Sequence, residues 1–347
     1  GFSIWRKSPD RKTYNRAVFD PARTVAECEK CGELNLFGGW GVTPKKGNWS
    51  LLRAHMLENL CQGNQEHYNY LMMALSQMFY EPGRKLGVCI VFRGPEGVGK
   101  SKLGEWLRAL VGLRHSITIH NTNNIAGQFN SIIENKILVL IEEAAITGDK
   151  RNVFAHIITN HAVTIEGKGI DAEDSVNYSR LMLFVNGEWA VPVLQGDRRY
   201  FVMDVGDKHK EDKEYFAAID AQMADGGAEA MLHDLLEMAV TMRQMPKPPM
   251  TDAKREQIEF GMGADVLWWA DVLREGRFRF SDSKRDAIYW KDGEAIAKDA
   301  VADSYRDALP GRAKSPNIAV GRFLEKWIPG IESKRGTNGV GREWQYI

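Results

Sequence analysis

Residues 88–111 decide the fold of this protein and read VCIVFRGPEGVGKSKLGEWLRALV. The first five residues are apolar and are typical of a buried strand. In the last ten, Leu103, Leu107 and Leu110 recur at helical spacing before Gly112, where a helix is expected to end. Between them stands the pattern G-x-x-x-x-G-K-S, in which glycines let successive backbone N–H groups turn toward phosphate oxygens. The stretch therefore predicts a strand, a phosphate-binding loop and a helix.

This loop predicts a binding site for ATP with Mg²⁺. Lys100 would reach the β- and γ-phosphates, the Ser101 hydroxyl would bind the metal, and the helix would direct its positive N-terminal end at the triphosphate. A dinucleotide-binding loop is excluded, because its third glycine would have to stand where Lys102 does. The predicted nucleotide-binding residues are Gly94, Pro95, Glu96, Gly97, Val98, Gly99, Lys100, Ser101 and Lys102.

A second apolar run ends in two carboxylates. Residues 136–144 read KILVLIEEA, which is typical of a parallel strand buried on both faces. Ligands of such sheets bind at the carboxyl ends of the strands. Glu142 is therefore predicted to complete the Mg²⁺ site with Ser101, and Glu143 to polarise the attacking water. The alternative is a pair of solvated glutamates that close a strand.

Two more predicted strands and a hairpin carry polar residues at their ends. Residues 180–186 form an apolar run that ends in Asn186, an amide placed to contact a γ-phosphate or the attacking water. A further strand up to residue 204 is preceded by Arg198 and Arg199. Alternating residues 161–170 predict a β-hairpin with Lys168 between two glycines at its tip. A solvated turn lysine is the alternative interpretation of that tip.

Composition bounds the class of protein. With 347 residues, 44% hydrophobic and 27% charged, the chain is expected to form two or three ordinary globular domains, with no membrane span and no signal peptide. Four cysteines indicate a reducing compartment, so we expect a cytoplasmic protein, in the host cytoplasm if a phage encodes it. Cys28 and Cys31 have the C-x-x-C spacing of one half of a zinc site, but no second Cys/His pair at ligand spacing follows them. Zero net charge argues against a uniformly basic nucleic-acid-binding surface but leaves room for a local basic groove.

The pattern along the chain predicts three regions. Residues 1–80 should hold an irregular segment up to residue 48 and then two helices. Residues 81–245 should form the phosphate-loop core, with a short strand over residues 116–120 and a helix over residues 124–133, and the proline-rich residues 245–250 a linker. Residues 251–347 should form a small domain of helices followed by a terminal hairpin. The start at Gly1 without methionine suggests a fragment of a longer polypeptide.

The phosphate loop, the two glutamates, the lysine-tipped hairpin, Asn186 and the paired arginines follow one another within about 110 residues. This order resembles the ATPase core of superfamily 3 helicases, especially the helicase module of phage and viral primase-helicases and primase-polymerases. The resemblance implies an AAA+-like α/β core with a mainly parallel sheet and a C-terminal winged-helix-like α+β domain. It implies that Asn186 is the sensor, Arg198 or Arg199 the arginine finger, and Lys168 the contact to single-stranded DNA. Glu142 stands where many phosphate-loop enzymes have Asp.

The predicted function is an ATP-dependent DNA helicase that assembles as a homohexameric ring, with a primase or polymerase domain preceding it in the same polypeptide. One alternative is a small-molecule or nucleotide kinase, in which the arginines would clamp phosphate within one subunit. A second alternative is a non-enzymatic, ATP-switched DNA-loading module. Glu143 and Asn186 argue against that module, because ATP binding alone would not need them.

Overall fold

The computed structural model describes residues 8–9, 11–127, 129–169, 171–281, 286–289, 295–310, 316–328, 331–338 and 341–346. The chain divides into two compact units, Gly1–Ile258 and Glu259–Ile347. The predicted domain boundaries around residues 80 and 245–251 stay predictions. Within the described ranges no helix is both long and apolar enough to cross a membrane.

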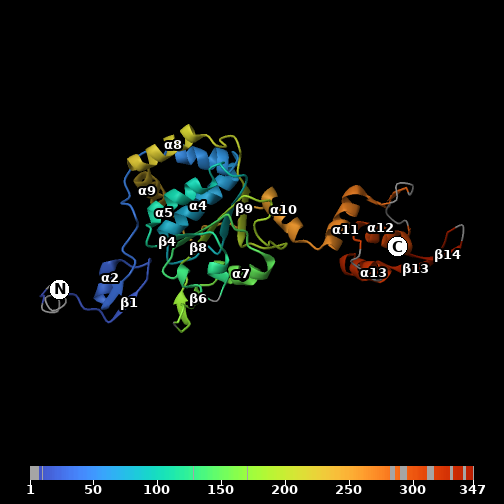
Figure 1. Ribbon diagram of the computed structural model, residues 1–347, viewed down its shortest axis with the longest axis horizontal. Coiled ribbons are helices and arrows are strands. Elements are labelled where there is room, and N and C mark those ends of the chain that lie inside the picture. The colour runs from blue at the N-terminus through green and yellow to red at the C-terminus, as the bar shows by residue number, and fades with distance from the viewer. Residues whose placement is uncertain are drawn as a thin grey trace. The chain divides into compact units, whose positions relative to one another are not determined.

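A five-stranded sheet forms the centre of the first unit (Figure 1). All its neighbouring strands are parallel, so their carboxyl ends lie at one edge. In spatial order the strands are β4 (Ser116–Ile119), β5 (Leu138–Glu142), β8 (Arg180–Val185), β3 (Cys89–Arg93) and β9 (Tyr200–Asp204). A strand was predicted from the sequence at each of these places, and each prediction is confirmed.

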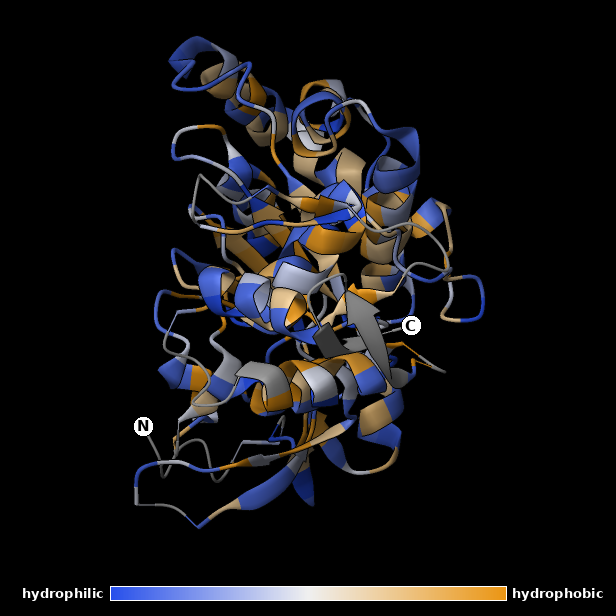
Figure 2. Ribbon diagram, turned by 90° about the vertical axis from the view of Figure 1, so that its right-hand side faces the viewer, coloured by the Kyte–Doolittle hydropathy of each residue, from blue (hydrophilic) through white to orange (hydrophobic). Residues whose placement is uncertain are grey.

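Successive residues of the strands supply two different cores, because side chains alternate between the faces of a sheet. Ile90 and Phe92 of β3 pack with helices α4 (Gln65–Tyr80), α5 (Lys100–Val111) and α9 (Ala228–Glu237). Cys89 and Val91 pack on the other face with α7 (Arg151–Thr159). Figure 2 shows the matching pattern in the helices, which carry apolar positions beside polar ones. Both faces of the sheet are therefore covered, as its continuous apolar strands require.

The N-terminal region is more regular than expected. The prediction of irregular structure up to residue 48 is wrong for the segment that forms a small parallel pair joined by a helix. Its elements are β1 (Arg16–Val18), α2 (Val25–Lys30) and β2 (Glu33–Asn35). Three-residue strands are too short to leave a period in the sequence, although Thr24 and Glu27 form a capping box at the start of α2.

The two predicted helices that follow are confirmed, and the first contains an unexpected π-helical turn. This helix runs through α3 (Ser50–Ala54) into η1 (His55–Leu60), in which the Cys61 N–H donates to the Met56 carbonyl five residues earlier. The second helix is α4. A helix expected over residues 124–133 is instead two short pieces, α6 (Asn123–Ala126) and η2 (Ser131–Ile133), separated by an extended Gly127.

The remaining elements of the first unit surround the sheet. The predicted hairpin is formed by β6 (Ala162–Ile165) and β7 (Glu173–Val176), which are antiparallel and project away from the sheet (Figure 1). The other elements are η3 (Gly148–Lys150), α8 (Lys213–Gln222), η4 (Met223–Gly227) and α10 (Asp252–Gly261). The unit boundary falls inside α10, beyond the proline-rich residues 245–250.

The described residues of the second unit form three helices and short strands around Trp268, Val301 and Tyr305. Its last three strands form one antiparallel sheet in the order β12-β14-β13. The elements are α11 (Ala264–Glu275), β10 (Arg277–Phe278), β11 (Ile288–Tyr289), β12 (Ile296–Ala297), α12 (Lys298–Ala308), α13 (Pro316–Trp327), β13 (Ser333–Asn338) and β14 (Gly341–Tyr346). The predicted helices and the two strands of the terminal hairpin are present.

Candidate functional site

The predicted phosphate loop joins the end of β3 to the start of α5. Gly97 and Gly99 have φ angles of +80° and +84°, which residues with side chains rarely adopt. A Cβ at Gly99 would also stand 2.3 Å from the ring of Phe216. Only glycine fits there, because both the backbone conformation and the neighbouring ring exclude a side chain. The loop is thus tightly curved and closely packed on its outer side.

The carbonyl groups of the loop are bonded from outside. The Gly97 carbonyl accepts from the Glu211 N–H at 2.9 Å, the Val98 carbonyl from Asn59 Nδ2 at 2.8 Å, and the Gly99 carbonyl pairs with His55 Nε2 at 3.1 Å. By contrast, the N–H groups of residues 97–101 donate to no residue that the structure describes. A run of N–H groups at a helix N-terminus, with the carbonyls held away, has the geometry that favours phosphate binding.

Lys100 lies across this loop. Its Nζ donates to the carbonyls of Gly94 at 2.7 Å and Pro95 at 2.5 Å. Burial lowers the pKa of Lys100, while the nearby carboxylates of Glu96 and Glu143 oppose that shift. The ammonium group is therefore held at the loop by backbone oxygens and lies within the electrostatic influence of Glu143.

The loop, the two glutamates and Asn186 surround one cavity of about 270 Å³. They meet because β5 and β8 end at the same edge of the sheet as β3. Nine predicted residues line the cavity: Glu96, Gly97, Gly99, Lys100, Ser101, Lys102, Glu142, Glu143 and Asn186. Gly94, Pro95 and Val98 are outside this lining, and Val98 is fully buried.

Glu143 has an unusual backbone. Its φ angle is +57°, and its N–H donates to the Phe184 carbonyl of the neighbouring strand at 3.0 Å. A positive φ is uncommon for a residue with a side chain, and such strain is concentrated at functional sites. The strained turn places Glu143, like Glu142, at the cavity.

Arg198 and Arg199 lie at the opposite edge of the sheet. They precede β9, whereas the phosphate loop follows its parallel neighbour β3. A five-residue strand spans about 17 Å, so this length separates the arginines from the edge that holds the cavity. Arg199 pairs with Asp197 at 3.3 Å, while Arg198 is exposed and bonds to no described residue. Neither arginine lines the cavity.

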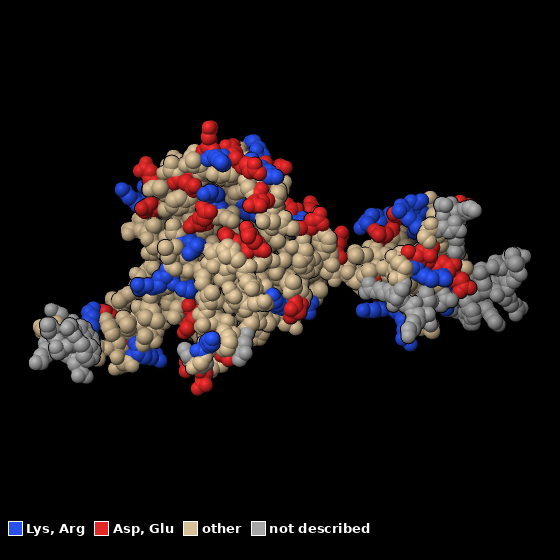
Figure 3. Space-filling model, viewed as in Figure 1, with Lys and Arg blue, Asp and Glu red and all other residues tan. Residues whose placement is uncertain are grey.

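Lys168 is exposed at the tip of the β6–β7 hairpin, next to Gly169, which has a φ of +75°. Asn130 bonds to the end of β6, just before the tip of this hairpin. Its Nδ2 donates to the Thr164 carbonyl at 2.9 Å, and its Oδ1 accepts from the Glu166 N–H at 2.9 Å. On the face shown in Figure 3, acidic and basic side chains are interspersed over the first unit. Lys168 is therefore distinguished by its exposed position at the hairpin tip and not by a cluster of basic side chains around it.

Several residues at the cavity escaped sequence reasoning. Glu105, Phe184 and Phe216 also line it, and no motif marks them. Lys102 was predicted, but its Nζ is bonded to Asp220 at 2.8 Å and to Glu105 at 3.0 Å. Burial alone would lower the pKa of Lys102, and these two carboxylates outweigh that effect and raise it. Lys102 therefore ties α5 to α8 at the rim of the cavity.

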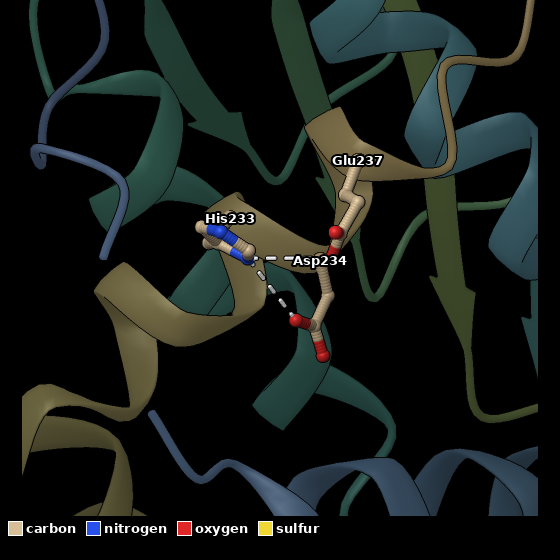
Figure 4. A group of neighbouring side chains, drawn as sticks. All are labelled: His233, Asp234 and Glu237. Atoms are coloured by element: carbon tan, nitrogen blue, oxygen red, sulfur yellow. Dashed lines mark hydrogen bonds and ion pairs between the residues drawn. The ribbon is translucent and has the colours of Figure 1, made fainter. Parts of the chain in front are cut away.

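A second group of polar residues lies on α9, away from the cavity. His233 Nδ1 is 3.4 Å from Asp234 Oδ1 and 3.8 Å from Glu237 Oε2 (Figure 4). The other oxygen of Asp234 accepts a hydrogen bond from the indole of Trp49 at 2.7 Å. These contacts connect the start of α3 to α9, and we assign the group no metal.

The comparisons with known proteins establish the fold. A family of unknown function (DUF5906) matches residues 92–199, from β3 to the residue before β9. No curated protein matches. The A form apo structure of the NrS-1 C terminal region is similar over 100% of this chain and 88% of that chain, with a TM-score of 0.72 and 18% identity. The apo structure of NrS-1 residues 305–718 gives 0.71 and 19% over the same shares. The chain thus has the mixed α/β fold of that region, with a mainly parallel central sheet.

Proposed function

We propose that this protein is an ATP-dependent DNA helicase or translocase module of a phage or viral replication protein. The observation that carries the proposal is the separation of complementary groups on one sheet. Phosphate-binding N–H groups, Lys100 and two carboxylates gather at one edge, while an exposed Arg198 lies at the other. Such a site is completed only when a neighbouring subunit contributes its arginine.

Within one subunit, the loop would bind the β- and γ-phosphates of ATP, with Lys100 neutralising their charge. Ser101 and Glu142 would hold Mg²⁺, which screens the phosphate charge as it develops. Glu143 would accept a proton from the attacking water, and the amide of Asn186 would orient that water. The water oxygen bonds to the γ-phosphorus, the bond to the β-γ bridging oxygen breaks, and ADP and phosphate are the products.

The ring is proposed to be a homohexamer of AAA+-like cores, with Arg198, or Arg199 in its place, reaching the ATP of the next subunit. The hairpins would bind one DNA strand in a central channel through Lys168. Phe129, next to the Asn130 that fixes the hairpin, is 47% exposed and offers a face for a stacked base.

The second unit is proposed to be a winged-helix-like domain. Three helices and a three-stranded sheet whose last two strands form a hairpin support that assignment. The resemblance to the helicase module of phage and viral primase-helicases further implies that a primase or polymerase domain would precede this chain in the full polypeptide. The protein would then act in the host cytoplasm.

The test is the ATPase rate with and without single-stranded DNA, measured across protein concentration. We expect a rate per subunit that rises with concentration as rings assemble and rises again with DNA. A kinase would ignore both variables and would transfer phosphate to a small acceptor. A loading module would bind ATP without turnover. Either of these results would overturn the helicase assignment.

A further inference from the structure

Two buried side chains of the N-terminal helices bond to the phosphate loop from behind. His55 and Asn59 lie four residues apart on η1 and are 0% and 2% exposed. His55 Nε2 is 3.1 Å from the Gly99 carbonyl, and Asn59 Nδ2 is 2.8 Å from the Val98 carbonyl. Residues four apart lie on the same side of a helix, so one element reaches two successive carbonyls of the loop.

The chemistry of these contacts fixes the tautomer of His55. A carbonyl oxygen can only accept, so Nε2 carries the proton that it donates to Gly99. Nδ1 then accepts from the Tyr215 hydroxyl at 3.2 Å. Burial lowers the pKa of His55 to about 4 and raises the pKa of Tyr215 to about 12, so both groups keep these forms at neutral pH. Both nitrogens of the His55 imidazole are therefore held by hydrogen bonds.

The element that carries these residues is itself uncommon. The turn from His55 to Leu60 is π-helical, and π-helical turns are frequent at functional sites. It also accepts a hydrogen bond at the Asn59 carbonyl from the Gly206 N–H at 2.9 Å, which joins it to the segment after β9. The turn thus connects the loop to a second strand end.

We propose that His55 and Asn59 are positioning residues for ATP binding, which hold the loop carbonyls outward and so keep the loop N–H groups directed at the phosphates. This inference rests on the proposed function of the loop. A glycine-rich loop has many conformations to lose, and that loss would otherwise oppose nucleotide binding. The two bonds order the loop before the nucleotide arrives.

The effect should fall on the KM for ATP. Because a hydrogen bond of this kind is typically worth a factor of about three to ten in an equilibrium, His55→Ala should raise the KM by about that factor. The kcat should stay within about twofold, since Lys100, Glu143 and the arginine remain. Asn59→Ala should act in the same direction. His55→Gln should recover much of the affinity, because its side-chain amide can donate to the same carbonyl.

The matched control is His115→Ala. His115 is also buried, at 5% exposure, but it lies at the other edge of the sheet against Phe19 and Phe37. The His115→Ala substitution should lower the unfolding temperature without changing the KM for ATP. A merely structural role of His55 would give the same result as His115, namely fewer active molecules with an unchanged KM. That result in both His55→Ala and Asn59→Ala would overturn the proposal, as would an equal rise in KM for His115→Ala.

Binding of a non-hydrolysable ATP analogue to the full chain separates this inference from the proposed function. If Lys100→Ala loses binding and the His55 and Asn59 variants bind like wild type, only the positioning role fails. If Lys100→Ala binds the analogue like wild type, the loop is not the nucleotide site and both proposals fail. Should His55→Ala not fold, Asn59→Ala carries the test, because it breaks only the bond to Val98.

Discussion

The two edges of the central sheet differ in where their charged side chains lie and in what those side chains contact. At the carboxyl edge, Lys100 and two glutamates surround a cavity. At the amino edge, Arg180 is buried and donates to the carbonyls of Pro82 and Arg84, so its charge is used inside the subunit. Arg198, at the same edge, is exposed and bonds to no described residue. The contrast indicates which cation is structural and which is available to a neighbouring molecule.

The largest effect on ATP hydrolysis is expected from substitutions at the carboxyl edge of the sheet. Lys100→Ala should reduce ATP hydrolysis to background, because the charge that develops on the phosphates loses its main counter-charge. Glu143→Gln should bind ATP but not turn it over. Steady-state phosphate release measures both, with exposed Lys46→Ala as the control. Near wild-type rates in both variants would show that the site lies elsewhere.

The next effect tests the amino edge. Arg198→Ala should bind nucleotide and hydrolyse it about 10³ to 10⁵ times more slowly, the range that arginine fingers contribute. Because the arginine is proposed to act on the ATP of a neighbouring subunit, mixing Arg198→Ala with Lys100→Ala subunits should restore part of the rate. Absence of recovery in verified mixed oligomers would contradict action between subunits, or would assign the role to Arg199.

A smaller effect, on stability, tests by pH whether His55 at the carboxyl edge is buried in its neutral form. The folded protein lowers the pKa of His55 from 6.5 to about 4, so the unfolded chain binds more protons in that range. His55 therefore stabilises the fold above pH 6.5, and this stabilisation, on the order of 3 kcal/mol, is lost as the pH falls toward 4. Unfolding temperatures at pH 7.0, 5.5 and 4.5 should fall less steeply in His55→Gln than in wild type. Parallel curves would exclude the buried neutral state.

The smallest effect concerns the hairpin, which belongs to neither edge. Lys168→Ala should weaken single-stranded DNA binding regardless of sequence and reduce the slope of log K against log salt by about 0.7, the value for one lost phosphate contact. Basal ATPase activity should be unchanged, while stimulation by DNA and strand separation fall together. Lys30→Ala is the exposed control. Unwinding at the wild-type rate would show that Lys168 is only a solvated lysine in a surface turn.

Local patterns were sufficient for most of the first unit. The strands, α5 and the hairpin were predicted because apolar runs, helical spacing and glycine turns leave direct traces in the sequence. Where elements were too short for a period, prediction failed, as in β1 and β2. The expected helix over residues 124–133 failed as well, because Gly127 interrupts it in an extended conformation.

The sequence by itself determined the glycine-rich loop after β3, the two carboxylates at the end of β5 and the amide after β8, since each is a local pattern attached to a strand end. Tertiary structure decided which strands are neighbours, and with that the cavity at which the predicted ends meet and the place of Arg198 at the far edge, because the order and direction of strands distant in the sequence leave no local pattern. It also decided that His55, Asn59 and Phe216 support the loop. Those contacts span between about 40 and 120 residues of chain, and no local spacing records which distant side chain will meet a given carbonyl.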